Sequence, residues 1–524
     1  MSLFRATFTV GGLTAVSRIL GFVRDILTAR IIGAGWVGDC FVLAFKLPNF
    51  FRRLFAEGAF SAAFVPMFSS LLEGEGLPKD ATPEERRRAA IAFTEQALSA
   101  LLGTLLLFVT VCQVFMPWLM MLLGAGFLDN PEKYDLAVQL TRITFPYLLF
   151  ISLVSLLGGV MNGLHRFAAV AFTPVLLNLC LIVPLALGLE VSTLASAHMQ
   201  AVAVSVAGVV QFLWLVVACR REGINLRLRL PSITPQVKRL LTIMAPVALG
   251  AGAFQVSLMI DTFLASFLRD GSMSFLYYAD RLNQLPLGVI GIAVGTALLP
   301  LLSRQVAAGD AAGAMSSQNR AIEMVWFLTL PAAAALVLMP ETLVRVLFQG
   351  QSFNADMTHA TAMALGAFAL GLPAYVLAKV LTPSYFARKN TRTPVRYAMI
   401  GLGINVVLNV ILMFPLAHVG LALATAIAAW VNAGLLYRGL IQRGHYEMDL
   451  RLKKRLPRIL AATGVMLAAL YGALLLLDGA LHDGGVVRFS ALAGVVLVGI
   501  GVYAAAAFGF GAITKTDLRS IRRR

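Results

Sequence analysis

The stretch AVSRILGFVRDIL, residues 15–27, lies in the first long apolar segment of the chain but carries two arginines and an aspartate. A charged side chain at the centre of a membrane span costs on the order of 3 kcal/mol. On a helical wheel, at about 100° per residue, the polar and small residues occupy roughly a third of the circle. These residues are Ser17, Arg18, Gly21, Arg24, Asp25 and Thr28. The stretch therefore predicts a membrane helix with one lipid-facing side and one polar side.

The composition extends this prediction to the whole chain. Of 524 residues, 59% are hydrophobic and 13% are charged, which is far outside the range of soluble globular proteins. About fourteen apolar runs are long enough to cross roughly 30 Å of hydrocarbon. Their centres lie near residues 20, 48, 105, 150, 177, 208, 252, 290, 331, 371, 404, 430, 467 and 499. The predicted fold class is an all-α polytopic membrane protein with about 14 transmembrane helices.

Basic residues are distributed unevenly between alternate loops, and this pattern gives an orientation. Lys and Arg concentrate in one set of loops and in the tail KTDLRSIRRR, whereas the other set is richer in acids. By the positive-inside rule, both termini are predicted to be cytoplasmic. Topology, with contact to anionic membrane lipids, explains most of the net charge of +17. Because the loops form no soluble basic domain, nucleic acid is not expected as a partner.

The reactive residue types do not form the patterns that enzymatic chemistry requires. The four cysteines lie in apolar segments without CxxC spacing, and the six histidines are scattered singly. The sequence lacks the GxxxxGK[ST] motif of a phosphate-binding loop. A membrane-embedded glycosyltransferase, one alternative, needs a catalytic acid or histidine on a substantial outer loop. We therefore expect a transporter, not an enzyme, that draws on an ion gradient or the membrane potential.

Two weak internal repeats divide the chain into lobes. The segment FKLPNFFRRLFAEGAFSAAFVPMFSSL from residue 45 resembles NQLPLGVIGIAVGTALLPLLSRQ from residue 283, and FPYLLF at 145 resembles LPAYVL at 372. A separation of about 230 residues predicts parallel repeats with pseudo-two-fold symmetry and a substrate site between them. The predicted parts are an N-lobe of helices 1–6 (1–225), a C-lobe of helices 7–12 (232–445), helices 13–14 (456–512) and a basic cytoplasmic tail (513–524).

Two further predicted helices carry charges on one face. In the second helix, the charged residues near multiples of seven apart, aligned within about 40°, are Asp39, Lys46, Arg53 and Glu57. Arg52 lies about 100° from that line, but a kink at Pro48 would rotate the lower half of the helix. The pattern leaves open whether Arg52 or Arg53 faces inward. In the eighth helix, one face holds Ser274, Tyr277, Arg281 and Gln284, with Asp280 beside it.

The charges on these three helices favour an anion-binding cavity. Six basic residues (Arg18, Arg24, Lys46, Arg52, Arg53 and Arg281) oppose four acidic ones (Asp25, Asp39, Glu57 and Asp280). Arginine predominates, and its planar fork suits bidentate contact with phosphate oxygens. The alternative is a set of structural ion pairs, such as Arg24 with Asp39. We interpret the pattern as a wet cationic cavity for a phosphorylated substrate.

One further acid raises the question of a cation site. Asp261 is the lone acid of its predicted helix, and oxygen partners are available from helices eleven and twelve at Asn405, Asn409 and Thr425. A cation site and a hydrogen-bonded structural acid fit this pattern equally well.

The segments AVSRILGFVRD, FKLPNFFRRLFAEGAFSAAFVP and YYADRLNQLPLGVIGIAVGTALLP resemble the MurJ (MviN) family of lipid II flippases, within the multidrug/oligosaccharidyl-lipid/polysaccharide exporter superfamily. The resemblance covers nearly the whole chain, including the helix pair after the twelve-helix core. It implies a bacterial inner-membrane protein that acts in cell wall biogenesis. Such a protein moves lipid II, the undecaprenyl-pyrophosphate-linked peptidoglycan precursor, from the cytoplasmic to the periplasmic leaflet by alternating access. An exporter of drugs or other lipid-linked oligosaccharides on the same fold is the alternative.

The resemblance also implies roles for individual residues. The family's cavity arginines correspond to Arg18, Arg24, Arg52 and Arg281, and further cavity positions correspond to Ser17, Asp25, Asp39, Glu57 and Asn162. A sodium site of the family maps onto Asp261, Asn405, Asn409 and Thr425, with Asn409 where an acid can occur. The terminal helix pair has two possible roles: it forms a groove for the polyprenyl tail, or it serves packing alone. The expected partners are lipid II, membrane lipids and the cell wall synthesis machinery, and the expected state is a monomer.

Overall fold

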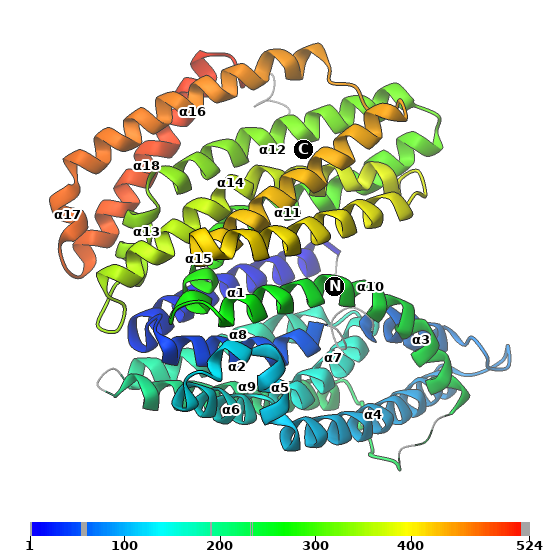
Figure 1. Ribbon diagram of the computed structural model, residues 1–524. Coiled ribbons are helices and arrows are strands. Elements are labelled where there is room, and N and C mark those ends of the chain that lie inside the picture. The colour runs from blue at the N-terminus through cyan, green and yellow to red at the C-terminus, as the bar shows by residue number, and fades with distance from the viewer. Residues whose placement is uncertain (1–2, 54–59, 189–190, 231, 233, 515–524) are drawn as a thin grey trace. The chain divides into compact units, whose positions relative to one another are not determined.

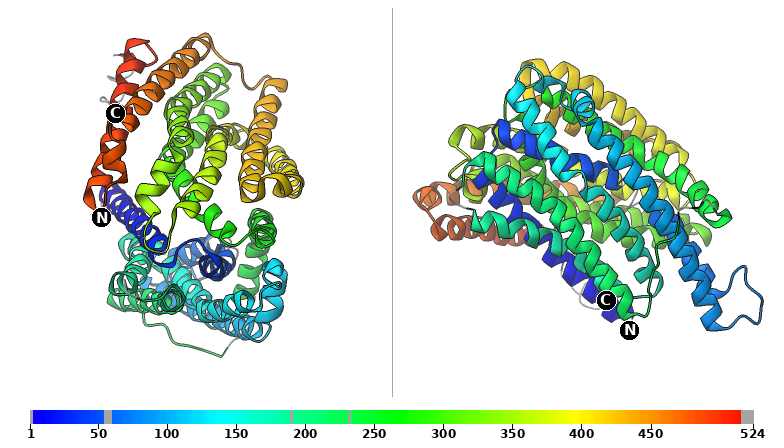
Figure 2. Two further views of the ribbon diagram at one scale, coloured as in Figure 1. Left: turned by 60° about the vertical axis from the view of Figure 1, so that its left-hand side comes forward. Right: turned by 90° about the horizontal axis from the view of Figure 1, so that it is seen from below.

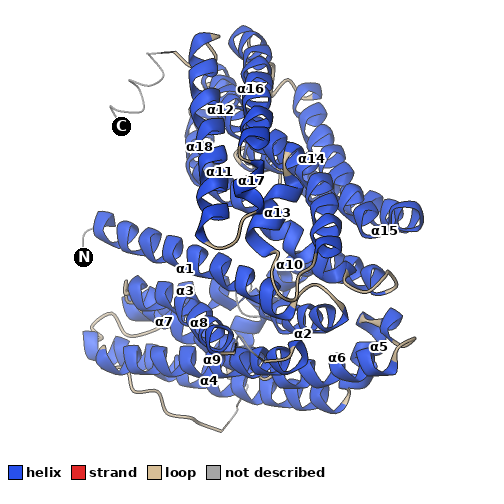
Figure 3. Ribbon diagram, turned by 90° about the vertical axis from the view of Figure 1, so that its left-hand side faces the viewer, coloured by secondary structure: helices blue, strands red, loops and turns tan. Residues whose placement is uncertain are grey.

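A computed structural model of the protein describes residues 3–53, 60–188, 191–230, 232 and 234–514. Within these ranges every regular element is a helix, as Figure 3 shows. The chain divides into two compact units. Unit 1 comprises residues 1–274 and 350–353, and unit 2 comprises residues 275–349 and 354–524. The predicted all-α fold class is confirmed.

Unit 1 is built from ten α-helices and one short 3-10 helix among its described residues (Figure 1). They are α1 (Leu3–Ile32), α2 (Trp36–Arg52), α3 (Ser61–Glu73), α4 (Pro83–Val114), α5 (Met116–Leu123), η2 (Ala125–Phe127), α6 (Pro131–Thr144), α7 (Tyr147–Gly163), α8 (Phe167–Leu187), α9 (Thr193–Arg221) and α10 (Pro235–Ser266). Helix α1 packs on α8, α2 on α6, and α7 on α9. The first turn of α11, up to Ser274, also belongs to this unit.

Unit 2 contains the rest of α11 and seven further helices. The helices are α11 (Ser272–Ala307), α12 (Ala311–Leu338), α13 (Pro340–Phe348), α14 (Ala355–Phe386), α15 (Arg392–Gln442), α16 (Leu450–Leu476), α17 (Asp478–His482) and α18 (Val486–Gly509). Helix α14 packs between α12 and α15, and α16 packs on both α12 and α18. Figures 1 and 2 show α16 and α18 side by side, in orange and red.

The predicted spans can be compared with these helices one by one. Each of the fourteen predicted centres falls within a described helix, and the centres near 404 and 430 fall within α15 alone. In the described part of the chain, nine helices are long and apolar enough to cross a membrane, which is consistent with a multi-pass membrane protein. The count of fourteen spans stays a prediction, as do the lobe boundaries. Helix α10, which we assigned to the C-lobe, packs on α3, α4, α5 and η2 of unit 1.

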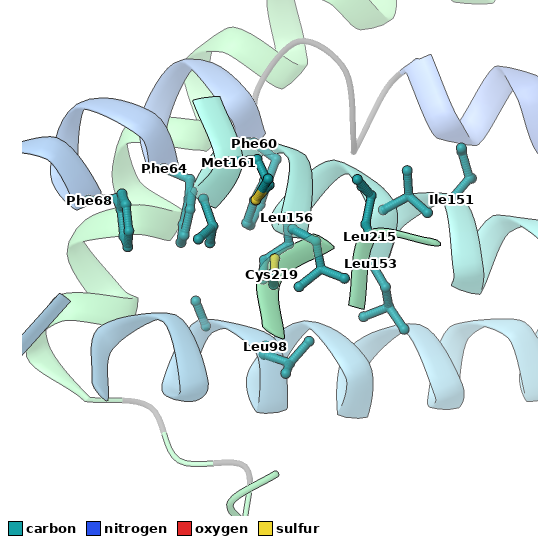
Figure 4. Packing of buried hydrophobic residues seen from close by; sticks show 14 of the residues in the cluster. Phe60, Phe64, Phe68, Leu98, Ile151, Leu153, Leu156, Met161, Leu215 and Cys219 are labelled. Carbon is teal, nitrogen blue, oxygen red and sulfur yellow. The ribbon is translucent and has the colours of Figure 1, made fainter. Parts of the chain in front are cut away.

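The core of unit 1 contains a ladder of aromatic rings. The rings of Phe60, Phe64 and Phe68 stack in succession, with centroids 5.2 and 5.8 Å apart, as Figure 4 shows. Helix α7 approaches this ladder closely because it presents glycine at residues 159 and 163. A Cβ atom at Gly159 would lie 2.8 Å from Cδ1 of Phe64. The glycines of α7 therefore permit the packing of α3 against α7.

We expect Gly159→Val to destabilise the protein by about 1–3 kcal/mol, because the added atoms would overpack the contact with Phe64. The thermal unfolding midpoint of the purified protein in detergent measures this loss. Gly403→Val is the matched control, since a Cβ at Gly403 meets no atom within 4 Å. An equal fall for both variants would contradict the packing explanation.

At three prolines within helices, a side chain donates to the carbonyl oxygen that the proline leaves without its usual partner. Proline removes the hydrogen bond to the carbonyl four residues earlier, which is costly in a membrane. The hydroxyl of Thr144 donates to the carbonyl of Ala44 at 2.7 Å, four residues before Pro48. Thr173 donates to Val170 at 2.8 Å, four residues before Pro174. Tyr503 donates to Phe327 at 2.6 Å, four residues before Pro331. Two of these bonds join different helices. At two of these prolines, the helix is thus held to a neighbouring helix by a side-chain hydrogen bond.

Helix α15 consists of two helical segments that meet at Ala417. Its backbone angles are φ 47° and ψ −130°, in the region that favours glycine. Replacing Ala417 with glycine should therefore stabilise the protein by about 1 kcal/mol, because a non-glycine residue there is strained. Thermal unfolding in detergent tests this expectation, with Ala417→Val as the opposing variant. A lower midpoint for Ala417→Gly than for the parent would refute it.

Candidate functional site

Arg24 is the most constrained of the predicted cavity arginines. It lies in α1 of unit 1, and only 8% of its surface is exposed. Its Nε and Nη2 atoms donate to Oδ1 of Asp25 at 3.2 and 2.7 Å. Its Nη1 donates to Oδ1 of Asn178 in α8 at 3.0 Å, and its Cζ lies 5.5 Å from the ring centroid of Phe45. The guanidinium is thus fixed by a carboxylate, an amide and an aromatic face.

Asn178 connects this arginine to Ser17, another predicted site residue. The Asn178 Nδ2 atom donates to the backbone carbonyl of Ser17 at 2.9 Å and lies 3.4 Å from its hydroxyl. Asn178 is 5% exposed. We did not predict a site role for it, although a buried amide in an apolar span is a signal that points to one.

The other predicted residues of unit 1 occupy more exposed places. Arg18 and Arg53 are exposed, and Asn162 is half-buried. Lys46 is half-buried, with Nζ 3.5 Å from the hydroxyl of Thr262. Glu57 lies outside the described residues.

Arg52 is better covered than its neighbour Arg53. It is half-buried, and its Nε donates to Oδ1 of Asn49 at 3.1 Å. Asn49 in turn donates to the carbonyl of Phe45, one helical turn earlier. Arg52 is therefore braced along α2.

Asp39 is held in a separate polar cluster of unit 1. Its carboxylate accepts from the backbone of Gly271 at 2.7 Å and from the backbone and hydroxyl of Ser274, both at 2.9 Å. Lys133 lies 3.5 Å from Asp39 and 2.7 Å from Asp270. The suggested pairing of Arg24 with Asp39 is therefore wrong, because Arg24 pairs with Asp25 and Asp39 with Lys133. Arg24 and Asp25 are neighbours in the sequence, whereas Lys133 is 94 residues from Asp39 and no local pattern could identify that pair.

In unit 2, Arg281 is supported by an aromatic side chain one turn earlier. Its Nη2 donates to the hydroxyl of Tyr277 at 3.1 Å, and its Cζ lies 4.8 Å from the Tyr277 ring centroid. Arg281 is half-buried. On the same helix, Gln284 donates a hydrogen bond to Asp280. This pairing places two of the predicted site residues in direct contact.

The residues of the predicted cation site are divided between the units. Asp261 belongs to unit 1, and the other three belong to unit 2. Within α15, Asn405 donates to Thr425 at 3.2 Å, and Asn409 donates to Asn405 at 3.2 Å. Asn405 and Asn409 are buried. The structure thus joins three of these side chains in one polar cluster.

Comparison with known proteins gives relatives over the whole chain. A protein of Rhizobium meliloti (strain 1021) named "Probable lipid II flippase MurJ" is 42% identical over 529 residues, covering 100% of this chain and 97% of the relative. A solved structure described as "Lipid II flippase MurJ, inward closed conformation" matches with a TM-score of 0.77 and 25% identity, covering 95% of this chain and 97% of that one. An inward-facing multidrug resistance MATE family transporter matches with a TM-score of 0.63 and 16% identity, over 83% and 98% of the two chains, which shows a shared fold.

The family model described as "Lipid II flippase MurJ" matches residues 28–495. That range includes all of α2 to α17 and parts of α1 and α18. Full-length similarity, the matching fold and the family model agree with the resemblance seen in the sequence. The chain belongs to the MurJ family of lipid II flippases.

Proposed function

We propose that the protein is a lipid II flippase of the bacterial inner membrane. It moves the undecaprenyl-pyrophosphate-linked precursor from the cytoplasmic to the periplasmic leaflet by alternating access, and both of its termini are cytoplasmic. The observation that carries this proposal is the 42% identity over the full chain to a relative named as a probable lipid II flippase. The protein is a transporter, in keeping with the solved structures it resembles.

The proposed substrate contacts are the arginines of the predicted cavity. A pyrophosphate carries several oxygens, and arginine can bind two of them with one planar fork. Arg24 and Arg281 are the leading contacts, because each is already oriented by neighbouring side chains. Arg18 and Arg52 complete the set. We expect the protein to act as a monomer, with the cell wall synthesis machinery as a partner.

Sodium is the proposed coupling ion. The amide and hydroxyl oxygens of Asn405, Asn409 and Thr425 are the type of ligand that hard cations prefer. The hydrogen bonds that gather these side chains in α15 support the proposal. Replacing sodium by choline in a reconstituted transport assay tests it, and an unchanged rate would exclude sodium coupling.

The function is tested by depleting the protein and measuring the leaflet in which lipid-linked precursors accumulate. We expect lipid II to accumulate in the cytoplasmic leaflet. Accumulation of a different lipid-linked sugar would favour the alternative exporter. Purified protein in vesicles that contain lipid II provides the direct assay, in which added protein should make the lipid accessible from the opposite side.

A further inference from the structure

The amide of Asn178 lies between two groups with opposite hydrogen-bonding character. The Arg24 guanidinium can only donate, and the backbone carbonyl of Ser17 can only accept. Asn178 meets both, since its Oδ1 accepts from Arg24 at 3.0 Å and its Nδ2 donates to Ser17 at 2.9 Å. Both partners require the same orientation of the amide. The side chain is therefore locked in one direction.

We propose that Asn178 is a positioning residue that sets the orientation of the Arg24 guanidinium for the substrate's pyrophosphate. This inference rests on the proposed function, in which Arg24 contacts lipid II. Asn178 acts from α8, and Arg24 lies on α1, so the contact also fixes how far the arginine extends from its own helix. Asn178 itself need not touch the substrate.

The surroundings of the pair restrict its movement. The amide of Asn178 packs on Gly21, where a Cβ atom would lie 3.5 Å from Nδ2. On the arginine side, the ring of Phe45 lies within cation–π distance of the guanidinium. Asp25 occupies the Nε edge of the arginine. The position of the guanidinium is therefore defined by α1, α2 and α8 together.

No other side chain of this shape fits both partners. Aspartate would accept from Arg24 but place a carboxylate oxygen against the Ser17 carbonyl. Leucine has a similar volume but offers neither a donor nor an acceptor. Both replacements therefore keep the packing and change only the polar contacts.

The test compares full-length Asn178→Leu with Arg24→Ala and with the double variant, each purified in detergent. Binding of lipid II and of undecaprenyl monophosphate is measured for each. We expect Asn178→Leu to weaken lipid II binding about tenfold, as for loss of a hydrogen bond to a charged group. The ratio of the affinity for lipid II to the affinity for undecaprenyl monophosphate should fall. In the Arg24→Ala background, Asn178→Leu should have no further effect, because Asn178 acts through Arg24.

Gln200→Leu is the matched control. Gln200 is also buried and donates from α9 to a backbone carbonyl of α8, at Leu181 (2.9 Å). Its loss should affect stability without changing the preference between the two lipids. If Asn178→Leu does not fold, Asn178→Ala, which also removes the bond to Arg24, gives the same comparison.

Three results would separate the two proposals. If Asn178→Leu keeps the normal preference for lipid II over undecaprenyl monophosphate while Arg24→Ala loses lipid II binding, the positioning role alone is overturned. Effects of Asn178→Leu and Arg24→Ala that simply add would also overturn it, since the asparagine would then act independently. Normal lipid II binding by Arg24→Ala would overturn the substrate contact on which the inference rests.

Discussion

Replacing Arg281 by alanine is expected to reduce lipid II translocation about 100-fold or more while leaving a folded protein. Arg281 can form two charge-assisted hydrogen bonds to a pyrophosphate, and each such bond contributes roughly a factor of ten or more. The side chain is half-buried and its guanidinium rests on the ring of Tyr277. Translocation is measured in vesicles by the accessibility of lipid II from each side.

Arg304→Ala is the matched control for this prediction. Arg304 lies on the same helix but is exposed in its last turn. We expect its removal to leave translocation close to normal. Arg281→Lys should fall between the parent and Arg281→Ala, because lysine keeps the charge but loses the planar fork. A normal rate for Arg281→Ala would contradict the role assigned to this arginine.

The polar face of α1 was predictable because helical periodicity is a local property of the sequence. The wheel separates the polar arc from the apolar side, and in the structure Arg24, Asp25 and Thr28 are indeed buried. Apolar Ile19 and Val23 are exposed, as expected for a lipid-facing surface. Periodicity shows on which side of the helix a side chain lies, but not how deeply that side chain is buried.

The partners of the charged residues could not be predicted in the same way. Arg24 bonds Asn178, 154 residues away, and Asp39 pairs with Lys133, 94 residues away. Such contacts depend on which helices become neighbours, which the sequence of either helix does not encode. Lys133, near the start of α6, is buried against the carboxylates of Asp39 and Asp270.

The bend in α15 shows the same limit for the backbone. Two apolar runs, centred near 404 and 430, correctly indicated two helical segments. The sequence between them contains Pro415, which can end a helix. A backbone conformation with positive φ, however, is adopted by Ala417, a residue type that does not favour it. Tertiary packing must impose that conformation, so the residue type gave no signal for it.

A cluster of ion pairs attaches the terminal helix pair to α12 in unit 2. Glu323 of α12 pairs with Arg455 and, at 3.2 Å, with Arg451, both of α16. Arg320 joins Glu323 to Asp449, the N-cap residue of α16. The side chains of Glu323 and Arg455 are each 10% exposed. The charges therefore depend on one another, because little water is available to solvate them.

We expect Glu323→Ala to destabilise the protein by about 3–5 kcal/mol, because it leaves the buried Arg455 without its carboxylate. A lower thermal midpoint in detergent would report this loss. Glu84→Ala is the matched control, since its pair with Arg88 at 3.6 Å is largely exposed and should contribute at most about 1 kcal/mol. A similar effect for both variants would contradict the role of burial.

The double variant Glu323→Leu with Arg455→Leu separates the cost of an unpaired charge from the value of the pair. Replacing both members of a buried ion pair by apolar residues is often nearly neutral, whereas removing one member is not. We therefore expect the double variant to recover much of the stability lost in Glu323→Leu alone. Recovery would mean that the pair chiefly specifies how α16 docks on α12. An additive loss would mean that each charge stabilises the terminal helix pair through other contacts, including those of Arg320 and Arg451.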